Sequence, residues 1–173
     1  SVIGISRNAP GNLKSRGGHY KEVPLKGDTY DLEGIAAMVD EHTKLVEIQR
    51  SRGYSLRNSL FPEDIKKIID VVKAKNPKTI CFVDNCYGEF TNKEEPIELG
   101  ADITAGSLIK NAGGGFAPTG AYICGRKDLV ERCAHQLTVP GLGDEMGSYA
   151  ASYRPFFEGL FLAPHMTRQA VMA

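Results

Sequence analysis

The alternation of strand-like and helix-like segments is the feature that most restricts how this chain folds. Short runs of β-branched and apolar residues, typical of strands, alternate with segments whose apolar residues recur every three or four positions, as along one helix face. The expected strands are residues 1–6, 20–25, 43–49, 79–83, 102–107 and 120–125. The expected helices are residues 32–39, 62–75, 126–137 and a longer one from about 144 towards the end. This order is typical of right-handed βαβ units, so the sequence predicts an α/β fold with a mainly parallel sheet and helices on both faces.

Local signals mark several of these elements. Asp31 stands directly before the first helical stripe, where its carboxylate is placed to cap the helix. Pro62 suits the first turn of the next helix, because a proline there loses no intrahelical hydrogen bond. Residues 79–83, "TICFV", form a continuous apolar run, as expected for a central strand covered on both faces.

Composition limits the kinds of partner. With 173 residues, 42% of them hydrophobic and 24% charged, residues 1–173 are expected to form one globular domain. Lys plus Arg and Asp plus Glu both number 21, so no excess charge favours nucleic acid or an anionic membrane. No apolar run approaches the roughly 20 residues that span a bilayer, and the first residues lack a signal-peptide pattern. We therefore expect a cytoplasmic protein that binds a small molecule.

The four cysteines indicate neither a disulfide framework nor a zinc site. Cys81, Cys86, Cys124 and Cys133 include no C-x-x-C pair, and each lies in an apolar strand or helix context. The sequence predicts that all four are reduced core residues and that no metal is bound.

Candidate site residues follow two of the expected strands. In open α/β sheets, ligands bind outside the carboxyl ends of the strands. Asp84 comes directly after residues 79–83, and Ser107 and Lys110 follow the next strand along the chain. Alone, such an aspartate is more often a turn residue or a helix cap, and such a lysine is more often a solvated surface residue. Their positions at neighbouring strand ends favour one shared crevice.

The surroundings of Lys110 favour a functional lysine. In "SLIKNAGGGFAPTG" it is the single charged residue among small and apolar neighbours, and three consecutive glycines allow close backbone approach. Desolvation of an ammonium lowers its pKa and makes the neutral amine more accessible. We therefore expect a lowered pKa at Lys110 and an amine suited to Schiff-base chemistry.

Three stretches together carry a resemblance to a known family. "VDNCYGEF", "ELGADITAGSLIKNAGG" and "PTGAYICGR" resemble the centre of the large domain of fold-type-I pyridoxal-phosphate enzymes, which have the aspartate aminotransferase-like fold. Among these, the chain is most similar to the Cys/Met-metabolism lyases, which include cystathionine lyases and methionine gamma-lyase. The segment "EIQRSRGYS" narrows the resemblance to the aluminium-resistance or methionine gamma-lyase-like branch. The resemblance extends over essentially the whole chain.

The resemblance implies roles for particular residues. Lys110 matches the lysine that binds pyridoxal 5'-phosphate covalently and then moves protons at the substrate carbon. Asp84 matches the aspartate that pairs with the pyridine nitrogen, which makes the ring a better electron sink. Tyr87 matches a position near the ring hydroxyl, and Ser107 matches a hydroxyl that contacts the phosphate. Ile109 stands where related enzymes have a second hydroxyl, so phosphate binding must use other groups.

The segment at the end of residues 43–49 leaves an alternative open. Guanidinium groups bind carboxylates and phosphates well, which favours a site role for this arginine-rich segment. Gln49, Arg50 or Arg52 therefore either contributes to the site or lies in a solvated loop. No role carries over cleanly from the better-known lyases to these residues or to Arg57.

The resemblance also implies a reaction and an assembly. The expected function is a carbon-sulfur lyase that removes the alpha proton of a sulfur amino acid, such as methionine or cystathionine, and then eliminates a thiol. Family sites form between subunits, which implies a dimer or a tetramer such as a homotetramer. Family members carry an upstream phosphate loop, a stacking aromatic residue and a C-terminal small domain. None of these is recognisable here, so we expect part of the large domain.

Two alternatives to this function stay open. Transamination or aldol cleavage would use the same lysine and aspartate. A truncated α/β module kept for binding a partner would use neither. Product analysis on a panel of amino acids distinguishes the first from elimination, and cofactor binding distinguishes the second.

Overall fold

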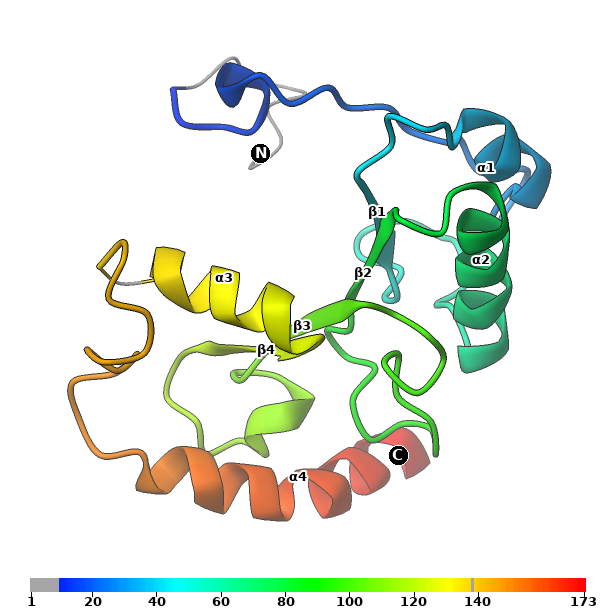
Figure 1. The fold of residues 1–173 in the computed structure, drawn as a ribbon. Helices are drawn as coiled ribbons and strands as arrows, with labels where there is room; N and C mark the ends of the chain where they lie inside the picture. Colours follow the sequence, from blue (N-terminus) through cyan, green and yellow to red (C-terminus); the bar gives the residue numbers. More distant parts are fainter. Residues whose placement is uncertain (1–9, 138) are drawn as a thin grey trace.

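A computed structural model describes residues 10–137 and 139–173 of the chain (Figure 1). Its four strands form one sheet in the order β1-β2-β3-β4. The strands are β1 (Leu45–Gln49), β2 (Ile80–Asp84), β3 (Ile103–Ser107) and β4 (Ala121–Gly125). The first three are parallel, whereas β4 runs antiparallel to β3. The fold is therefore α/β with a mixed, mainly parallel sheet, as the sequence predicts.

Helices follow the strands in the predicted alternation. They are α1 (Leu32–Met38), α2 (Pro62–Lys75), α3 (Lys127–Leu137) and α4 (Arg154–Met172), with short 3-10 turns η1 (Lys14–Arg16) and η2 (Asn111–Gly113). Asp31 caps α1 as predicted, because its carboxylate accepts a hydrogen bond of 3.0 Å from the backbone N–H of Gly34. Pro62 occupies the start of α2.

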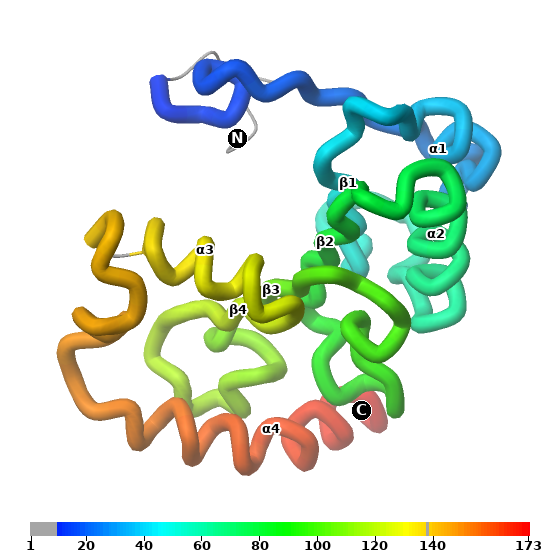
Figure 2. The backbone as a smooth tube through the Cα atoms, in the orientation of Figure 1, coloured from blue at the N-terminus to red at the C-terminus, as the bar shows by residue number. Residues whose placement is uncertain are grey.

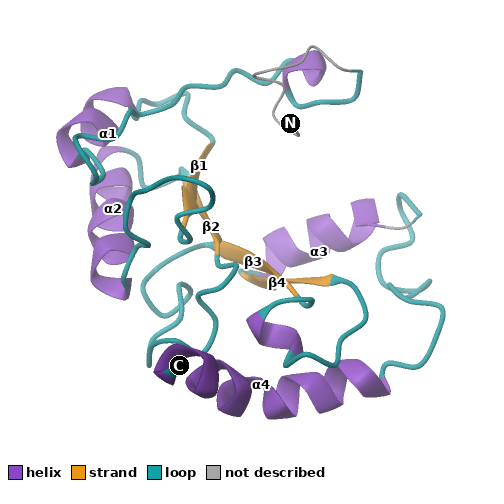
Figure 3. Cartoon of the chain, turned by 180° about the vertical axis from the view of Figure 1, so that it is seen from behind, coloured by secondary structure: helices purple, strands orange, loops and turns teal. Residues whose placement is uncertain are grey.

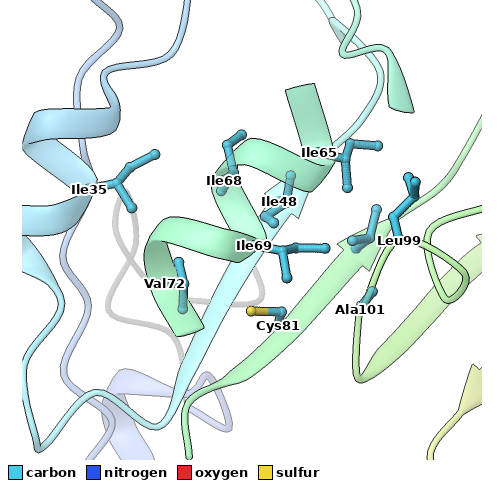
Figure 4. Packing of buried hydrophobic residues seen from close by; sticks show 10 residues of the cluster. Ile35, Ile48, Ile65, Ile68, Ile69, Val72, Cys81, Leu99 and Ala101 are labelled. Atoms are coloured by element: carbon cyan, nitrogen blue, oxygen red, sulfur yellow. The ribbon is translucent and has the colours of Figure 1, made fainter. Parts of the chain in front are cut away.

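The main hydrophobic core lies between α2 and the strands β1 and β2 (Figure 4). The side chains of Ile65 and Val72 from α2 are fully buried against Cys81 and Val83 of β2. Each such aliphatic side chain stabilises the fold by about 1.5–3 kcal/mol through removal from water. This packing holds β1 and β2 in register, so their carboxyl ends lie side by side.

Two predicted elements differ in the structure. Residues 20–25 form no strand with any described residue, and most of their side chains are exposed. Pro24 lacks a backbone N–H, so this segment is a poor member of a ladder. The last helix begins at Arg154 rather than near residue 144, because turns occupy the segment before it, where Gly143 and Gly147 have φ of 60° and 67°. The strand expected at residues 1–6 lies outside the described residues.

The chain spreads into an arm and a body (Figure 2). The arm is the described segment before α1; it includes η1 and runs away from the sheet towards the N-terminal end (Figure 3). Helix α4 lies along the opposite side of the body, below η2. The predicted close approach at the glycine run occurs against α4. A Cβ at Gly114 would lie 2.3 Å from the Gly159 carbonyl oxygen, and one at Gly159 would lie 2.2 Å from the Gly113 carbonyl oxygen. The glycines therefore let the turn after Lys110 pack directly on the helix backbone.

All four cysteines are free thiols, but they are not all core residues. Cys81 is buried, Cys86 and Cys133 are half-buried, and Cys124 is exposed. The prediction is wrong for Cys124 because β4 is the edge strand of the described sheet, with four of its five residues exposed.

Candidate active site

The candidate site lies where the parallel strands end. Gln49, Asp84 and Ser107 are the last residues of β1, β2 and β3. Gln49 pairs directly with Asp84 in the ladder, and Asp84 pairs with Ala105. Lys110 follows β3 in a tight turn, in which its backbone N–H donates to the Ser107 carbonyl at 3.2 Å. The sheet thus brings the predicted residues to one edge.

Lys110 and Tyr87 are in direct contact. The Lys110 Nζ lies 4.3 Å from the centroid of the Tyr87 ring, within the range of a cation–π interaction. Tyr87 has φ of 66°, in the left-handed region that residues other than glycine rarely adopt, and its side chain is 60% exposed. Such a backbone persists only where neighbouring contacts hold it, and it is commonest at functional sites.

The expected lowering of the Lys110 pKa is wrong. Partial burial does lower the pKa of this half-buried ammonium, but the Cys86 thiol, Tyr87 and Asp84 around it outweigh that effect and raise the pKa above its ordinary value. The sequence showed small and apolar neighbours along the chain. The groups that face the amine come instead from the loop after β2, which no pattern around Lys110 reveals.

Cys86 is a member of the site that the sequence assigned to the core. Its backbone N–H donates to Asp84 Oδ1 at 3.0 Å, which orients that carboxylate. Burial raises the pKa of the Cys86 thiol, and the nearby Asp84 carboxylate raises it further, whereas Lys110 lowers it. The thiol therefore stays protonated at neutral pH. Its place two residues after a strand end was the signal that could have identified it.

Gln49 and Ser107 reach the same edge without joining the Lys110 cluster through their side chains. The Gln49 side chain is exposed, and its amide donates back to the Ser51 carbonyl at 3.2 Å. Ser107 contributes its carbonyl to the turn before Lys110, as described above, and the residue is half-buried. The structure thus places the lysine, aspartate and tyrosine together and leaves these two at the rim.

The Arg50 side chain is buried, so Arg50 is not part of a solvated loop. Its side chain is only 4% exposed, and desolvation lowers the pKa of its guanidinium. Nη1 donates to Asn85 Oδ1 at 2.7 Å and lies 3.5 Å from a Glu95 carboxylate oxygen. Nη2 donates to Asn92 Oδ1 at 2.7 Å and to the Thr91 hydroxyl at 3.3 Å. Arg50 therefore ties the end of β1 to the loop that carries Asp84 and Tyr87.

The other two arginines of this segment lie at the surface. Arg57 Nη2 donates to the carbonyls of Gln49, at 2.8 Å, and Ser51, at 2.5 Å, which fastens the loop after β1. Arg52 is exposed.

The buried carboxyl group of Glu89 continues the Arg50 network. The Tyr122 hydroxyl donates to Glu89 Oε1 at 2.9 Å and accepts from Asn85 Nδ2 at 3.2 Å. Burial raises the pKa of Glu89, which is 4% exposed and whose Oε2 has no hydrogen-bond partner within the described residues. The burial of Glu89 outweighs the opposing effects of the Tyr122 hydroxyl and the Arg50 guanidinium, so its carboxyl group keeps its proton to a higher pH than an exposed glutamate does.

A cavity of about 290 Å³ opens beside this cluster. It lies between the loops that follow β1 and β2, with Ser59 and Phe61 on one side and Cys86 and Tyr87 on the other. Cys86 and Tyr87 thus belong both to the wall of the cavity and to the surroundings of the Lys110 amine. Within the described residues, no three His, Cys, Asp or Glu side chains are grouped as a metal ion would require.

Comparison with known proteins identifies the family. A family model described as methionine gamma-lyase matches residues 1–173. The chain belongs to the methionine gamma-lyase family. The predicted resemblance is therefore confirmed. An uncharacterised 33.9 kDa protein of Lactobacillus delbrueckii subsp. bulgaricus is 47% identical over 173 residues, which is 98% of this chain and 56% of that protein.

Solved structures of relatives agree with this membership. A carbon-sulfur lyase involved in aluminium resistance from Clostridium novyi NT is 51% identical, with a TM-score of 0.91. A Listeria monocytogenes protein, provisionally described as a cystathionine beta-lyase involved in aluminium resistance, is 49% identical with a TM-score of 0.95. They are covered over 41% and 42% of their lengths, by 98% and 99% of this chain. The chain thus spans less than half of these relatives.

A more distant structure supports the fold alone. Cystathionine gamma-lyase from Lactobacillus plantarum is 19% identical to this chain, with a TM-score of 0.52, and 82% of this chain covers 33% of that one. The predicted fold-type-I architecture is confirmed for the part of these relatives that the chain covers. In residues 10–137 and 139–173, no helix combines the length and hydropathy needed to cross a membrane.

Proposed function

We propose that the full-length protein is a pyridoxal-phosphate-dependent carbon-sulfur lyase acting on a sulfur amino acid. The observation that carries the proposal is the meeting of an amine, a carboxylate and an aromatic ring at the carboxyl ends of β2 and β3. The amine of Lys110 lies over Tyr87, with Asp84 close enough to raise its pKa. Membership in the methionine gamma-lyase family supports the same chemistry.

These residues fit the chemical demands of the cofactor. An amine is needed to bind its aldehyde, a carboxylate to face its ring nitrogen, and the pair here meets at one strand edge. Lys110 would hold the aldehyde carbon, Asp84 the ring nitrogen and Tyr87 the ring hydroxyl. At the rim, Ser107 would contact the phosphate of the cofactor, and Gln49 would contact its outer edge. When bound, the cofactor supplies an electron sink for a carbanion.

The chain's own groups would then move the protons. Lys110 Nζ is the group placed to remove the proton from the alpha carbon of the amino acid, after which the thiol leaves from the side chain. Asp84, oriented by the Cys86 N–H, would hold a proton at the ring nitrogen. The half-exposed position of Lys110 lets a small amino acid reach it from solvent. A cytoplasmic location and a dimer or tetramer stay predictions.

Borohydride trapping tests the proposal. Full-length protein incubated with pyridoxal phosphate and reduced with borohydride should carry one cofactor adduct, located by peptide mass spectrometry on Lys110. Lys110→Ala should lose the adduct, whereas Lys93→Ala, which removes an exposed lysine outside the cluster, should keep it.

Product analysis then identifies the reaction. Incubation with methionine and with cystathionine should release a thiol and a keto acid. An adduct on another lysine would contradict the assignment of Lys110. Amino-group transfer without thiol release would favour transamination, and absence of any adduct would favour the non-catalytic module.

A further inference from the structure

The side chain that follows Lys110 joins the two halves of the candidate site. Asn111 Nδ2 donates one hydrogen bond to the Tyr87 carbonyl, at 3.2 Å, and another to the Glu89 carbonyl, at 3.1 Å. The two acceptors lie 24 and 22 residues earlier in the sequence. One amide thus bridges the turn after β3 and the loop after β2.

The two acceptors lie in the most distorted part of that loop. Tyr87 and Phe90 both have positive φ, of 66° and 61°, and they are the only residues other than glycine with this property in the described parts of the chain. A left-handed backbone that carries a side chain needs contacts that hold it in place. The Asn111 amide is such a contact, because it binds the carbonyl of Tyr87 itself and that of the residue before Phe90.

We infer that Asn111 is a positioning residue, which fixes the Tyr87 ring against the Lys110 amine by holding the loop after β2 to the turn that carries the lysine. The Lys110 Nζ to ring-centroid distance of 4.3 Å depends on both segments. The backbone of Lys110 is fixed on one side by Ser107, and Asn111 fixes the tyrosine relative to it. The inference deepens the proposed function, but the contact itself does not require that function to be correct.

The inference predicts a change in the reactivity of one amine. The ring favours the ammonium form of Lys110, and a cation–π contact at an exposed site is worth a factor of about two to five in that equilibrium. When the ring moves away, the fraction of free amine at a fixed pH increases by that factor. Asn111→Leu keeps the approximate size of the side chain and removes both donors, without adding a charge beside Asp84, Cys86 and Lys110.

The test is trace acetylation of the full-length protein at pH 8, after bound carbonyl compounds have been removed with hydroxylamine. Peptide mass spectrometry gives the rate at Lys110 relative to the exposed Lys93. We expect about two- to fivefold faster acetylation in Asn111→Leu and in Tyr87→Leu, with no further gain in the double variant. Ile109→Ala, at the exposed residue on the other side of the lysine, should leave the rate unchanged.

Two results would overturn the inference. One is a wild-type rate in a folded Asn111→Leu. The other is an equal acceleration by Asn111→Leu in the Tyr87→Leu background, since that would show general loosening rather than an effect through the ring. If Asn111→Leu does not fold, Asn111→Ser, which has a single shorter donor, should give the same direction of change. Acetylation needs no cofactor, so a failure here is distinguishable from a failure of the borohydride test.

Discussion

Replacement of Arg50 by methionine should destabilise the protein severely. Arg50 is the centre of the network that fastens the loop after β2, with three side-chain acceptors and the Glu95 carboxylate around its guanidinium. Methionine keeps most of the length of the side chain and removes every donor. The substitution removes the ionic partner of Glu95, which keeps its hydrogen bonds from Asn85 Nδ2 and the Phe90 N–H, and it leaves Asn85 Oδ1 without the Arg50 donor.

The size of the effect follows from burial. Removal of one member of a buried ion pair costs about 3–5 kcal/mol, because the remaining charge is uncompensated. The Arg50 side chain is 4% exposed, but that of Glu95 is 34% exposed, so water can partly solvate the carboxylate that remains. We therefore expect the lower end of that range, a loss of about 3 kcal/mol in the free energy of unfolding.

Urea denaturation of the full-length protein, followed by circular dichroism, measures this loss. Arg52→Met, at an exposed position of the same segment, is the matched control and should change stability by less than about 0.5 kcal/mol. The double variant Arg50→Met/Glu95→Gln should regain about 1 kcal/mol, because the unpaired charge is gone. A loss below about 1 kcal/mol in Arg50→Met, or one equal to that of the control, would refute the reasoning.

Three further perturbations test other parts of the structure. Burial alone would raise the pKa of Asp102, but its hydrogen bonds, first among them the one from Lys73 Nζ at 2.6 Å, lower it. The stabilisation that Asp102 contributes is therefore present above the ordinary aspartate pKa and is lost as pH falls through its pKa in the folded protein. Asp102→Asn should remove this loss of stability at acid pH, as measured by urea denaturation. Burial raises the pKa of Glu89, so the stability that this residue contributes should fall as pH rises above the ordinary glutamate pKa. The free energy of unfolding of Glu89→Gln should therefore depend less on pH between pH 4 and pH 7 than that of wild type. Equal pH dependence in the two proteins would contradict the raised pKa. Gly159→Ala should destabilise the protein by about 1–3 kcal/mol, because the added Cβ would lie 2.2 Å from the Gly113 carbonyl oxygen. In an unobstructed helix the same substitution would stabilise. Increased resistance to urea would show that the Gly113 backbone moves aside.

The sequence predicted the elements that local chemistry specifies. The stripe of isoleucines and valine in α2, the Asp31 cap and the apolar run of β2 each carry their signal within a few residues. The segment at 20–25 has strand-forming residues as well, but a strand also needs a partner, and none is available to it in the described chain. The start of the last helix was misplaced because turns that contain positive-φ glycines, the last of them Gly147, occupy the beginning of the segment expected to be helical.

For the candidate site, the sequence likewise predicted the positions of residues at strand ends but not the contacts between distant segments. The strand-end positions of Asp84 and Lys110 follow from the alternation of elements, and the sheet does bring them to one edge. The pKa of Lys110 depends on Cys86, which lies 24 residues away in sequence, and no local pattern contains that contact. The sequence left Arg50 open between a site residue and a solvated loop residue, because the partners that bury it come from residues 85 to 95, beyond the reach of any motif around it.

A crystal structure of the full-length protein grown with pyridoxal phosphate would be the most direct test of the central claim. The account predicts continuous density from the Nζ of residue 110 into the cofactor, with the carboxylate of residue 84 within hydrogen-bonding distance of the ring nitrogen at the far end. Density for the cofactor at any other lysine, or a carboxylate of residue 84 turned away from the ring, would contradict it.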